Sequence, residues 1–225
     1  MKKVIVFLAA MWAFAAWAAN VSEIRVFKPA NGRYMDMMQE AVEARAIQEK
    51  LGATVYIGSD QNGNLQYGVT FPDWGAWAAF GAKLQASKDW AAFIKKVDVA
   101  NPASTQVNVF YLDTPVVPKT LPVTVVYSWD IDYKVPGAFD KFMAMAQQAV
   151  AIQTKLGASP GINVDQLGNV HYETAFDSWA SWAKFTAALE KDSEWTALMK
   201  KVNDAPTAEL VNVTMIETYT APTSP

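Results

Sequence analysis

The sequence predicts an α+β protein made of two copies of one module, each with the order strand, helix, strand, strand, helix, strand. The main observation is a pattern at 71–80 that returns at 176–185, with an aromatic followed by two tryptophans and a phenylalanine, each three residues further on. The repeat extends beyond this pattern, because residues 47–97 and 152–202 share 24 of 51 positions without a gap. We conclude that the chain arose by internal duplication.

The N-terminal residues are typical of a secretory signal peptide. Lys2 and Lys3 give a basic start, residues 4–17 are almost wholly apolar, and residues 16–18 have the small-x-small pattern of a cleavage site. The apolar run is shorter than the roughly 20 residues that a transmembrane helix needs. We expect residues 1–18 to be a signal peptide and the mature protein to be periplasmic or secreted, without a stable membrane anchor.

The first module is expected to span 19–114. Residues 23–27 alternate polar and apolar side chains as a half-buried strand does, and Gly52 stands where a helix C-terminal glycine belongs. The Asn62-Gly63 pair predicts a hairpin, because both residue types tolerate positive φ. The expected elements are strands at 23–27, 54–59, 65–71 and 107–112 and helices at 33–51 and 73–97, the second of them broken near Ser87.

A proline-rich linker at 115–122 is expected to separate the modules, because proline lacks the N–H that a central strand needs. The second module, at 123–221, repeats the order of the first. Its expected elements are strands at 123–129, 162–165, 170–176 and 210–219 and helices at 137–156 and 178–202.

The composition argues against several classes of function. The formal charge is −3 with acids and bases interspersed, so no basic surface for nucleic acid is expected. One histidine and no cysteine argue against a transition-metal site, and Asp130 with Asp132 lack the glycine and glutamate of a calcium loop. The sequence has no nucleophile elbow, Walker loop or dinucleotide fingerprint. We therefore expect no metal and no cofactor.

The element order, with a two-strand hairpin in the middle, is that of the ferredoxin-like unit. The helix pattern, in which a strand ends in an aromatic and Asp/Ser-Trp-x-x-Trp follows, resembles the dimeric α/β-barrel superfamily and within it the antibiotic-biosynthesis-monooxygenase-like modules. The resemblance implies two facing sheets that form a barrel, here supplied by one chain as a tandem pseudo-dimer, so we expect a monomer. It leaves the activity open, because the superfamily includes monooxygenases, haem-degrading enzymes and isomerases. Haem-degrading members carry a helix histidine as iron ligand, whereas the only histidine here is His171, on a strand.

Strand alternation predicts which residues face the barrel interior. In the third strand of the first module, Leu65, Tyr67, Val69 and Phe71 are expected under the helices. The interior positions differ between the copies, since Gln66 is replaced by His171 and Gly68 by Glu173. The copies keep their helix-side residues and differ at the interior positions, which is consistent with a site in the cavity.

His171 and Glu173 are the catalytic candidates. They point the same way from one strand, about 6.5–7 Å apart, and a carboxylate beside a histidine can hold the tautomer of a general base. The alternative is a hydrogen-bonded polar pair that lines a wet cavity. The candidate ligand-binding residues of this cavity are Arg25, Gln66, Asn108, His171, Glu173 and Asn212.

Most tryptophans lie in helical stripes with other apolar residues, which predicts core packing. Trp129 is the exception, because it lies beside Asp130 and Tyr133 in a loop that only the second module has. It is the candidate for a contact at the barrel rim.

The expected function is binding of a small apolar or aromatic molecule in the cavity between the two sheets. A cofactor-free monooxygenase or isomerase at the same cavity is the first alternative. The second is a non-catalytic structural or interaction protein whose barrel is filled by side chains. The sequence leaves open whether the protein is an enzyme.

Overall fold

The computed structural model describes residues 20–97 and 101–219. The first repeat consists of β1 (Asn20–Pro29), α2 (Tyr34–Lys50), β2 (Thr54–Asp60), β3 (Leu65–Phe71), α3 (Trp74–Ala86), α4 (Lys88–Lys96) and β4 (Ser104–Val116). The second consists of β5 (Val123–Ile131), α5 (Ala138–Lys155), β6 (Ser159–Asp165), β7 (Val170–Phe176), α6 (Trp179–Leu189), α7 (Ser193–Asp204) and β8 (Ala208–Thr218). The expected signal peptide lies outside the described residues, and no helix within them is long and apolar enough to cross a membrane.

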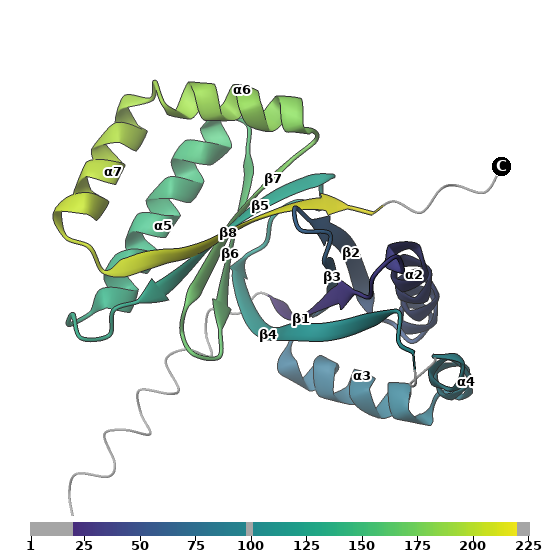
Figure 1. Ribbon diagram of the computed structural model, residues 1–225. Helices are drawn as coiled ribbons and strands as arrows, with labels where there is room; N and C mark the ends of the chain where they lie inside the picture. Colours follow the sequence, from purple (N-terminus) through teal and green to yellow (C-terminus); the bar gives the residue numbers. More distant parts are fainter. Residues whose placement is uncertain (1–19, 98–100, 220–225) are drawn as a thin grey trace, which may run out of the picture.

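The strands form one closed antiparallel barrel in the order β1-β3-β2-β8-β5-β7-β6-β4 (Figure 1). The pairing repeats with the sequence, since Val21 of β1 lies opposite Phe71 and Val123 of β5 lies opposite Phe176. Two seams join the repeats, one between β4 and β6 and one between β2 and β8. The α+β class and the repeated element order are therefore as predicted.

The second expected helix of each repeat, at 73–97 and at 178–202, is divided in two. Ser87 separates α3 from α4 as predicted, and its hydroxyl accepts a hydrogen bond from the Trp90 N–H at 3.2 Å. The prediction of one helix at 178–202 is wrong, because Asp192 begins α7 by accepting from the Trp195 N–H at 2.8 Å. At the expected linker, β4 continues to Val116, which pairs with β6, so the strand includes the first two residues of 115–122.

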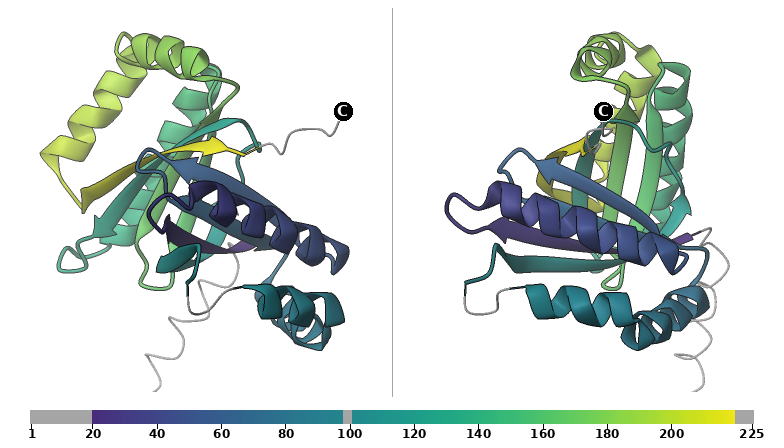
Figure 2. Two further views of the ribbon diagram at one scale, coloured as in Figure 1. Left: turned by 45° about the vertical axis from the view of Figure 1, so that its right-hand side comes forward. Right: turned by 90° about the vertical axis from the view of Figure 1, so that its right-hand side faces the viewer.

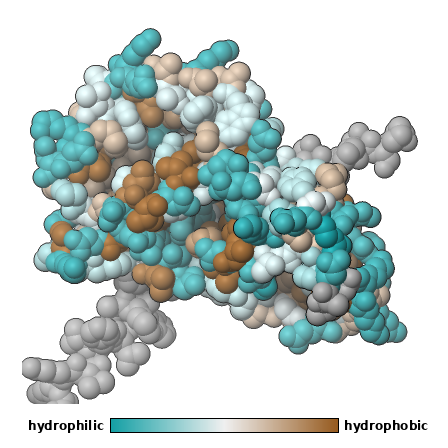
Figure 3. Space-filling model, viewed as in Figure 1, coloured by the Kyte–Doolittle hydropathy of each residue, from teal (hydrophilic) through white to brown (hydrophobic). Residues whose placement is uncertain are grey.

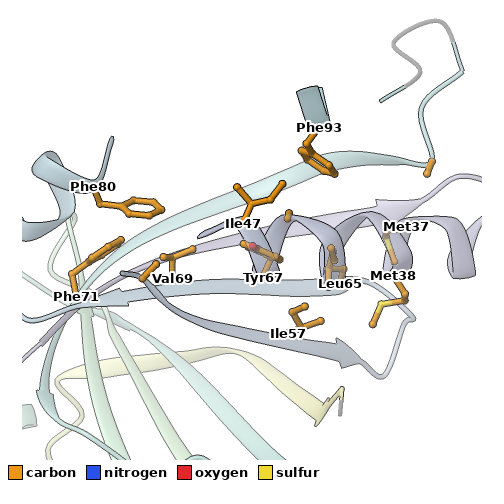
Figure 4. Packing of buried hydrophobic residues seen from close by; sticks show 14 of the residues in the cluster. Met37, Met38, Ile47, Ile57, Leu65, Tyr67, Val69, Phe71, Phe80 and Phe93 are labelled. Atoms are coloured by element: carbon orange, nitrogen blue, oxygen red, sulfur yellow. The ribbon is translucent and has the colours of Figure 1, made fainter. Parts of the chain in front are cut away.

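Helices cover the outer face of each half of the barrel, and the inner faces of the two halves meet (Figure 2). In the first repeat, the β3 side chains Tyr67, Val69 and Phe71 point toward α2 and α3, where Ile47 and Phe80 lie (Figure 4). The second repeat has the corresponding core on α5, α6 and α7. Most strands are thus covered on both sides, by helices outside and by the opposite half inside, whereas residues 105–108 of β4 and 209–213 of β8 are exposed.

Side chains fill the barrel interior near its centre, where two glycines are required. A Cβ on Gly58 would lie 2.4 Å from the Tyr56 hydroxyl and 2.5 Å from Ile216 Cγ2. A Cβ on Gly161 would lie 2.6 Å from Pro118 Cδ and 2.9 Å from Glu173 Oε1. Real Cβ atoms do not approach other atoms so closely, so side chains of the same or the neighbouring strand, and Pro118, already take the space beside these two glycines.

The open edges of the last strands are protected from pairing with other chains. Gln61 bonds the edge of β8, donating to the Val213 carbonyl at 3.2 Å and accepting from the Met215 N–H at 2.8 Å. The equivalent Gln166 accepts from the Tyr111 N–H of β4 at 3.3 Å. Each strand also carries a register shift at an exposed valine, Val107 or Val211. Hydrophobic side chains accordingly show on the face that β8 crosses (Figure 3), and bulges of this kind discourage edge pairing.

We predict that Gly58→Ala destabilises the protein by about 1–3 kcal/mol, because the added methyl group overpacks the barrel centre. The matched control is Gly81→Ala in α3, where a Cβ meets nothing within 4 Å, and where alanine is the better helix former by about 1 kcal/mol. Urea unfolding of both variants measures the difference. Equal stability of the two variants would contradict a filled interior.

Candidate functional site

The structure places the predicted interior residues of β3 and β7 on the inner face of the barrel. Tyr67 and Tyr172 lie in the helix-side cores, as expected from alternation. Gln66, on the other face, donates to Asp60 Oδ2 at 3.1 Å. This bond ties the strand to the hairpin of its own repeat.

His171 occupies the position equivalent to Gln66 and makes a longer chain of polar contacts. Its Nδ1 lies 2.9 Å from Ser128 Oγ, and its Nε2 lies 3.4 Å from Asp165 Oδ2. The Phe110 ring of the first repeat meets the imidazole edge-on, with centroids 5.2 Å apart. Burial lowers the pKa of His171, and the Asp165 carboxylate opposes this shift. The carboxylate that contacts the histidine is therefore Asp165. The strand spacing had predicted Glu173, and that prediction is wrong.

Glu173 takes part in a separate network near the barrel centre. It accepts from Asn163 Nδ2 at 2.8 Å, and Asn163 Oδ1 accepts from the Thr114 hydroxyl at 2.7 Å. Burial raises the pKa of Glu173. Burial also raises the pKa of Tyr56 to about 12, and the charge of Glu173 adds to this shift. The network links β4 to β6 and β7, and so holds the seam between the repeats.

Three other candidate residues lie away from these networks. Asn108 and Asn212 are exposed, and each bonds within its own strand, to the Val109 N–H at 2.8 Å and to Thr214 Oγ1 at 3.1 Å. Trp129 is not a rim contact, because β5 extends through it and its ring packs on Phe142 of α5, with centroids 5.5 Å apart.

Arg25 lies on the opposite face of the sheet from His171 and Glu173. It pairs with Tyr67, so its side chain points to the helices and not into the barrel. The prediction that Arg25 joins the interior cavity is therefore wrong. Alternation alone could not reveal this, because both faces of β1 carry apolar residues, with Val21 and Phe27 toward the helices and Val26 on the other face.

Arg25 instead borders a cavity of about 890 Å³ between the sheet and the helices of the first repeat. The walls come from β1, β3, α2, α3 and α4 and are mainly aromatic and aliphatic. The aromatic part consists of Phe27, Tyr67, Phe71, Trp77, Phe80, Trp90 and Phe93. Cavities of this size and character hold small, largely apolar molecules.

A polar cluster of Glu23, Arg25, Gln106 and the Trp77 indole N–H lies at the border of this cavity. Arg25 Nε and one terminal nitrogen lie 2.6 and 2.5 Å from Glu23 Oε1, and its other terminal nitrogen donates to Gln106 Oε1 at 3.0 Å. Trp77 Nε1 donates to the second oxygen of Glu23 at 2.7 Å. The carboxylate is largely buried, with 13% of its side chain exposed, whereas the arginine side chain is 44% exposed.

Glu40 of α2 is the other carboxylate of the lining. Burial raises the pKa of Glu40, and the neighbouring Asp36 and Glu43 raise it further, while Arg33 lowers it.

The second repeat has different residues at the positions of this polar cluster. The strand registers and the shared Tyr–Gln hydrogen bonds of the two repeats fix the equivalent positions. Each polar residue is replaced by an apolar or aromatic one: Glu23 by Val125, Arg25 by Tyr127, Glu40 by Met145 and Gln106 by Leu210.

The second repeat also carries larger residues at the apolar wall. Trp129 replaces Phe27 and Phe142 replaces Met37, and these two rings pack on each other. The space is therefore filled in the second repeat and open in the first. The sequence contained this signal, because comparing the two copies along α2 and β4 identifies Glu40 and Gln106, which the reading of single strands missed.

The cavity does not fit the iron ligation of a haem protein. Its lining contains no histidine or cysteine, and its one thioether, Met37, is 1% exposed. Within residues 20–97 and 101–219, no cluster of three or more His, Cys, Asp or Glu side chains is arranged to hold a metal ion. The residues at hand therefore support binding by packing and hydrogen bonds.

No protein-family model matches the chain, and no curated protein matches it in sequence. Solved structures do resemble it. A candidate monooxygenase from Fusobacterium nucleatum superimposes with a TM-score of 0.66 at 10% identity, covering 90% of this chain and 93% of the other. A candidate monooxygenase from Lactobacillus acidophilus gives 0.62 at 11% identity, with coverage of 89% and 94%. Chlorite dismutase from Candidatus Nitrospira defluvii gives 0.52 at 9% identity, with coverage of 94% and 95%. At these identities the likeness establishes a shared fold, that of the dimeric α/β-barrel proteins.

We predict that Glu173→Gln stabilises the protein at neutral pH and not in acid. Because burial raises the pKa of this carboxyl above 4.5, the folded state holds its proton where the unfolded chain has lost it. The stability of the wild type therefore falls as the pH rises from 4.5 through the folded pKa, and glutamine removes this loss. Urea unfolding from pH 4 to 8, with the exposed Glu209→Gln as control, measures the effect. A pH-independent difference would show that Glu173 is not the titrating group.

Proposed function

We propose that the protein binds a small, largely apolar or aromatic molecule in the cavity between the sheet and the helices of its first repeat. The observation that carries the proposal is the contrast between the repeats. One copy of a duplicated module keeps an open cavity with a polar cluster, and the other fills the same space with Trp129 and Phe142. An empty apolar space costs stability unless it is used, so its retention in one copy supports a ligand.

The proposal moves the predicted ligand from the barrel interior to the helix side of the sheet. The interior networks of His171 and Glu173 are satisfied within the protein, and side chains meet at the level of Gly58 and Gly161. The first-repeat cavity combines about 890 Å³ with aromatic walls and a few polar groups, which is the usual make-up of a small-molecule site.

The test transplants the filling residues of the second repeat into the first. We expect Phe27→Trp with Met37→Phe to weaken binding of the fluorescent probe N-phenyl-1-naphthylamine by about tenfold or more, equivalent to about 1.4 kcal/mol. The two new rings take the space that the probe needs, in a backbone that already accommodates them in the second repeat. Probe fluorescence at fixed protein concentration measures the affinity.

The matched control makes the reverse exchange, Trp129→Phe with Phe142→Met, in the second repeat. This variant is expected to leave the first-repeat affinity unchanged. If the wild type does not bind the probe, or if the first-repeat exchange leaves its affinity unchanged, the proposed function is wrong.

A cofactor-free oxygenase acting in the same cavity is the second candidate. Two of the similar structures are of candidate monooxygenases. In this chain, Glu40 is a carboxyl group with a raised pKa on the cavity wall, which suits a base that removes a proton from a bound aromatic molecule. Oxygen consumption with a bound substrate would distinguish this candidate from simple binding.

Two wider proposals accompany this function. We infer that the two repeats correspond to the two subunits of a dimeric barrel, joined here as a pseudo-dimer, since strand pairing repeats between the halves. We also propose that the protein acts after export, on the basis of its N-terminal segment. Secretion of a reporter fused to residues 1–18 tests the second.

A further inference from the structure

The geometry points to a ligand that carries a hydrogen-bond acceptor oxygen, a carbonyl or a carboxylate, on an aromatic body, with Arg25 and Gln106 receiving that oxygen. This inference rests on the proposed function of the same cavity and adds the chemical class of the ligand.

The acceptors of the polar cluster are mostly occupied. Oε1 of Glu23 takes two nitrogens of Arg25, and Oε2 takes the indole N–H of Trp77. Gln106 Oε1 takes a third N–H from Arg25. By lone-pair count, only one further acceptor position remains on Glu23 Oε2 and one on Gln106 Oε1.

The donors of the cluster are only partly used. A guanidinium has five N–H groups in one plane, and those of Arg25 directed at Glu23 and Gln106 leave two among the contacts of the described residues. The amide of Gln106 accepts from Arg25 with its oxygen, so its NH₂ group remains a donor. Arg25 is 44% exposed and borders the cavity together with Gln106.

Glu23 also fixes the position of these donors. Its carboxylate is held by Trp77 on one side and by Arg25 on the other, so the guanidinium is oriented before any ligand arrives. Because Glu23 balances the charge of Arg25, the cluster suits a neutral carbonyl as well as an anion. Glu40, the other carboxylate of the lining, lies on α2, and among the described residues it makes no hydrogen bond to the cluster.

The second repeat has no such donors at the positions equivalent to Arg25 and Gln106 on its β5 and β8 strands. Its equivalents of Arg25 and Gln106 are Tyr127 and Leu210, and its equivalent of Glu23 is Val125. The donor pair and the residue that orients it are therefore all absent from the copy whose cavity is filled. The three polar residues belong to the open cavity and are not required by the fold.

The experiment compares three naphthalenes of similar shape as competitors for N-phenyl-1-naphthylamine. They are 2-acetylnaphthalene, 2-naphthoate and 2-isopropylnaphthalene, which carry a neutral acceptor, a charged acceptor and no acceptor. We expect at least one of the two acceptor compounds to bind about tenfold tighter than the hydrocarbon, as hydrogen bonds to a charged group allow. The stronger of the two identifies the ligand as a ketone-like or an acid-like molecule.

The variants Arg25→Met and Gln106→Leu are expected to reduce this preference and to leave binding of 2-isopropylnaphthalene unchanged. Methionine keeps the apolar stem of arginine and removes the donors, and leucine is the residue that the second repeat has at the position of Gln106. Gln106 is exposed, so its replacement tests the inference even if Arg25→Met unfolds the protein. Arg45→Met, on α2 outside the cavity lining, is the control and is expected to keep the preference.

Equal binding of the three compounds by the wild type would overturn the inference while leaving the proposed function intact. A preference that survives in both variants would overturn the assignment to Arg25 and Gln106. Failure of the probe and of all three compounds to bind would show instead that the proposed function itself is wrong, and the inference with it.

Discussion

Closure of the barrel is the constraint on which the rest of the structure depends. The two seams, β4 with β6 and β2 with β8, are short compared with the pairing inside each repeat. The hairpin glutamines Gln61 and Gln166 reinforce them by bonding the partner repeat's last strand. Once the seams form, most strand residues are covered on both sides, and the side chains that point inward must fit among those of the neighbouring strands.

That narrow space explains why the interior is a structural centre and the ligand cavity lies elsewhere. Gly58 and Gly161 are needed where Tyr56 and Glu173 reach in from the walls. Glu173 and His171, which also point inward, are held by Asn163 and Asp165, as buried polar groups usually are. A cavity of about 890 Å³ lies on the outer face, between the sheet and the helices of the first repeat.

Duplication allowed the two outer faces to diverge. Both repeats keep the residues that hold helix to strand, including the hydrogen bonds of Tyr67 to Gln48 and of Tyr172 to Gln153, at 3.1 and 3.0 Å. The first repeat adds a polar cluster to an open cavity, while the second uses larger rings and gains core packing. Under the proposed function, this division gives one half of the barrel to ligand binding and the other to stability.

The sequence by itself determined the duplication, the element order, the hairpins and the helix-facing residues of β3 and β7. These follow from local periodicity and turn chemistry, which do not depend on distant contacts. It also identified Arg25 as a residue suited to a ligand. Only the tertiary structure decided that Arg25 faces the helices, that His171 pairs with Asp165, and that Trp129 packs on Phe142. Those outcomes depend on strand register and on barrel closure, which bury both faces of each strand and so remove the contrast between polar and apolar sides that sequence patterns record.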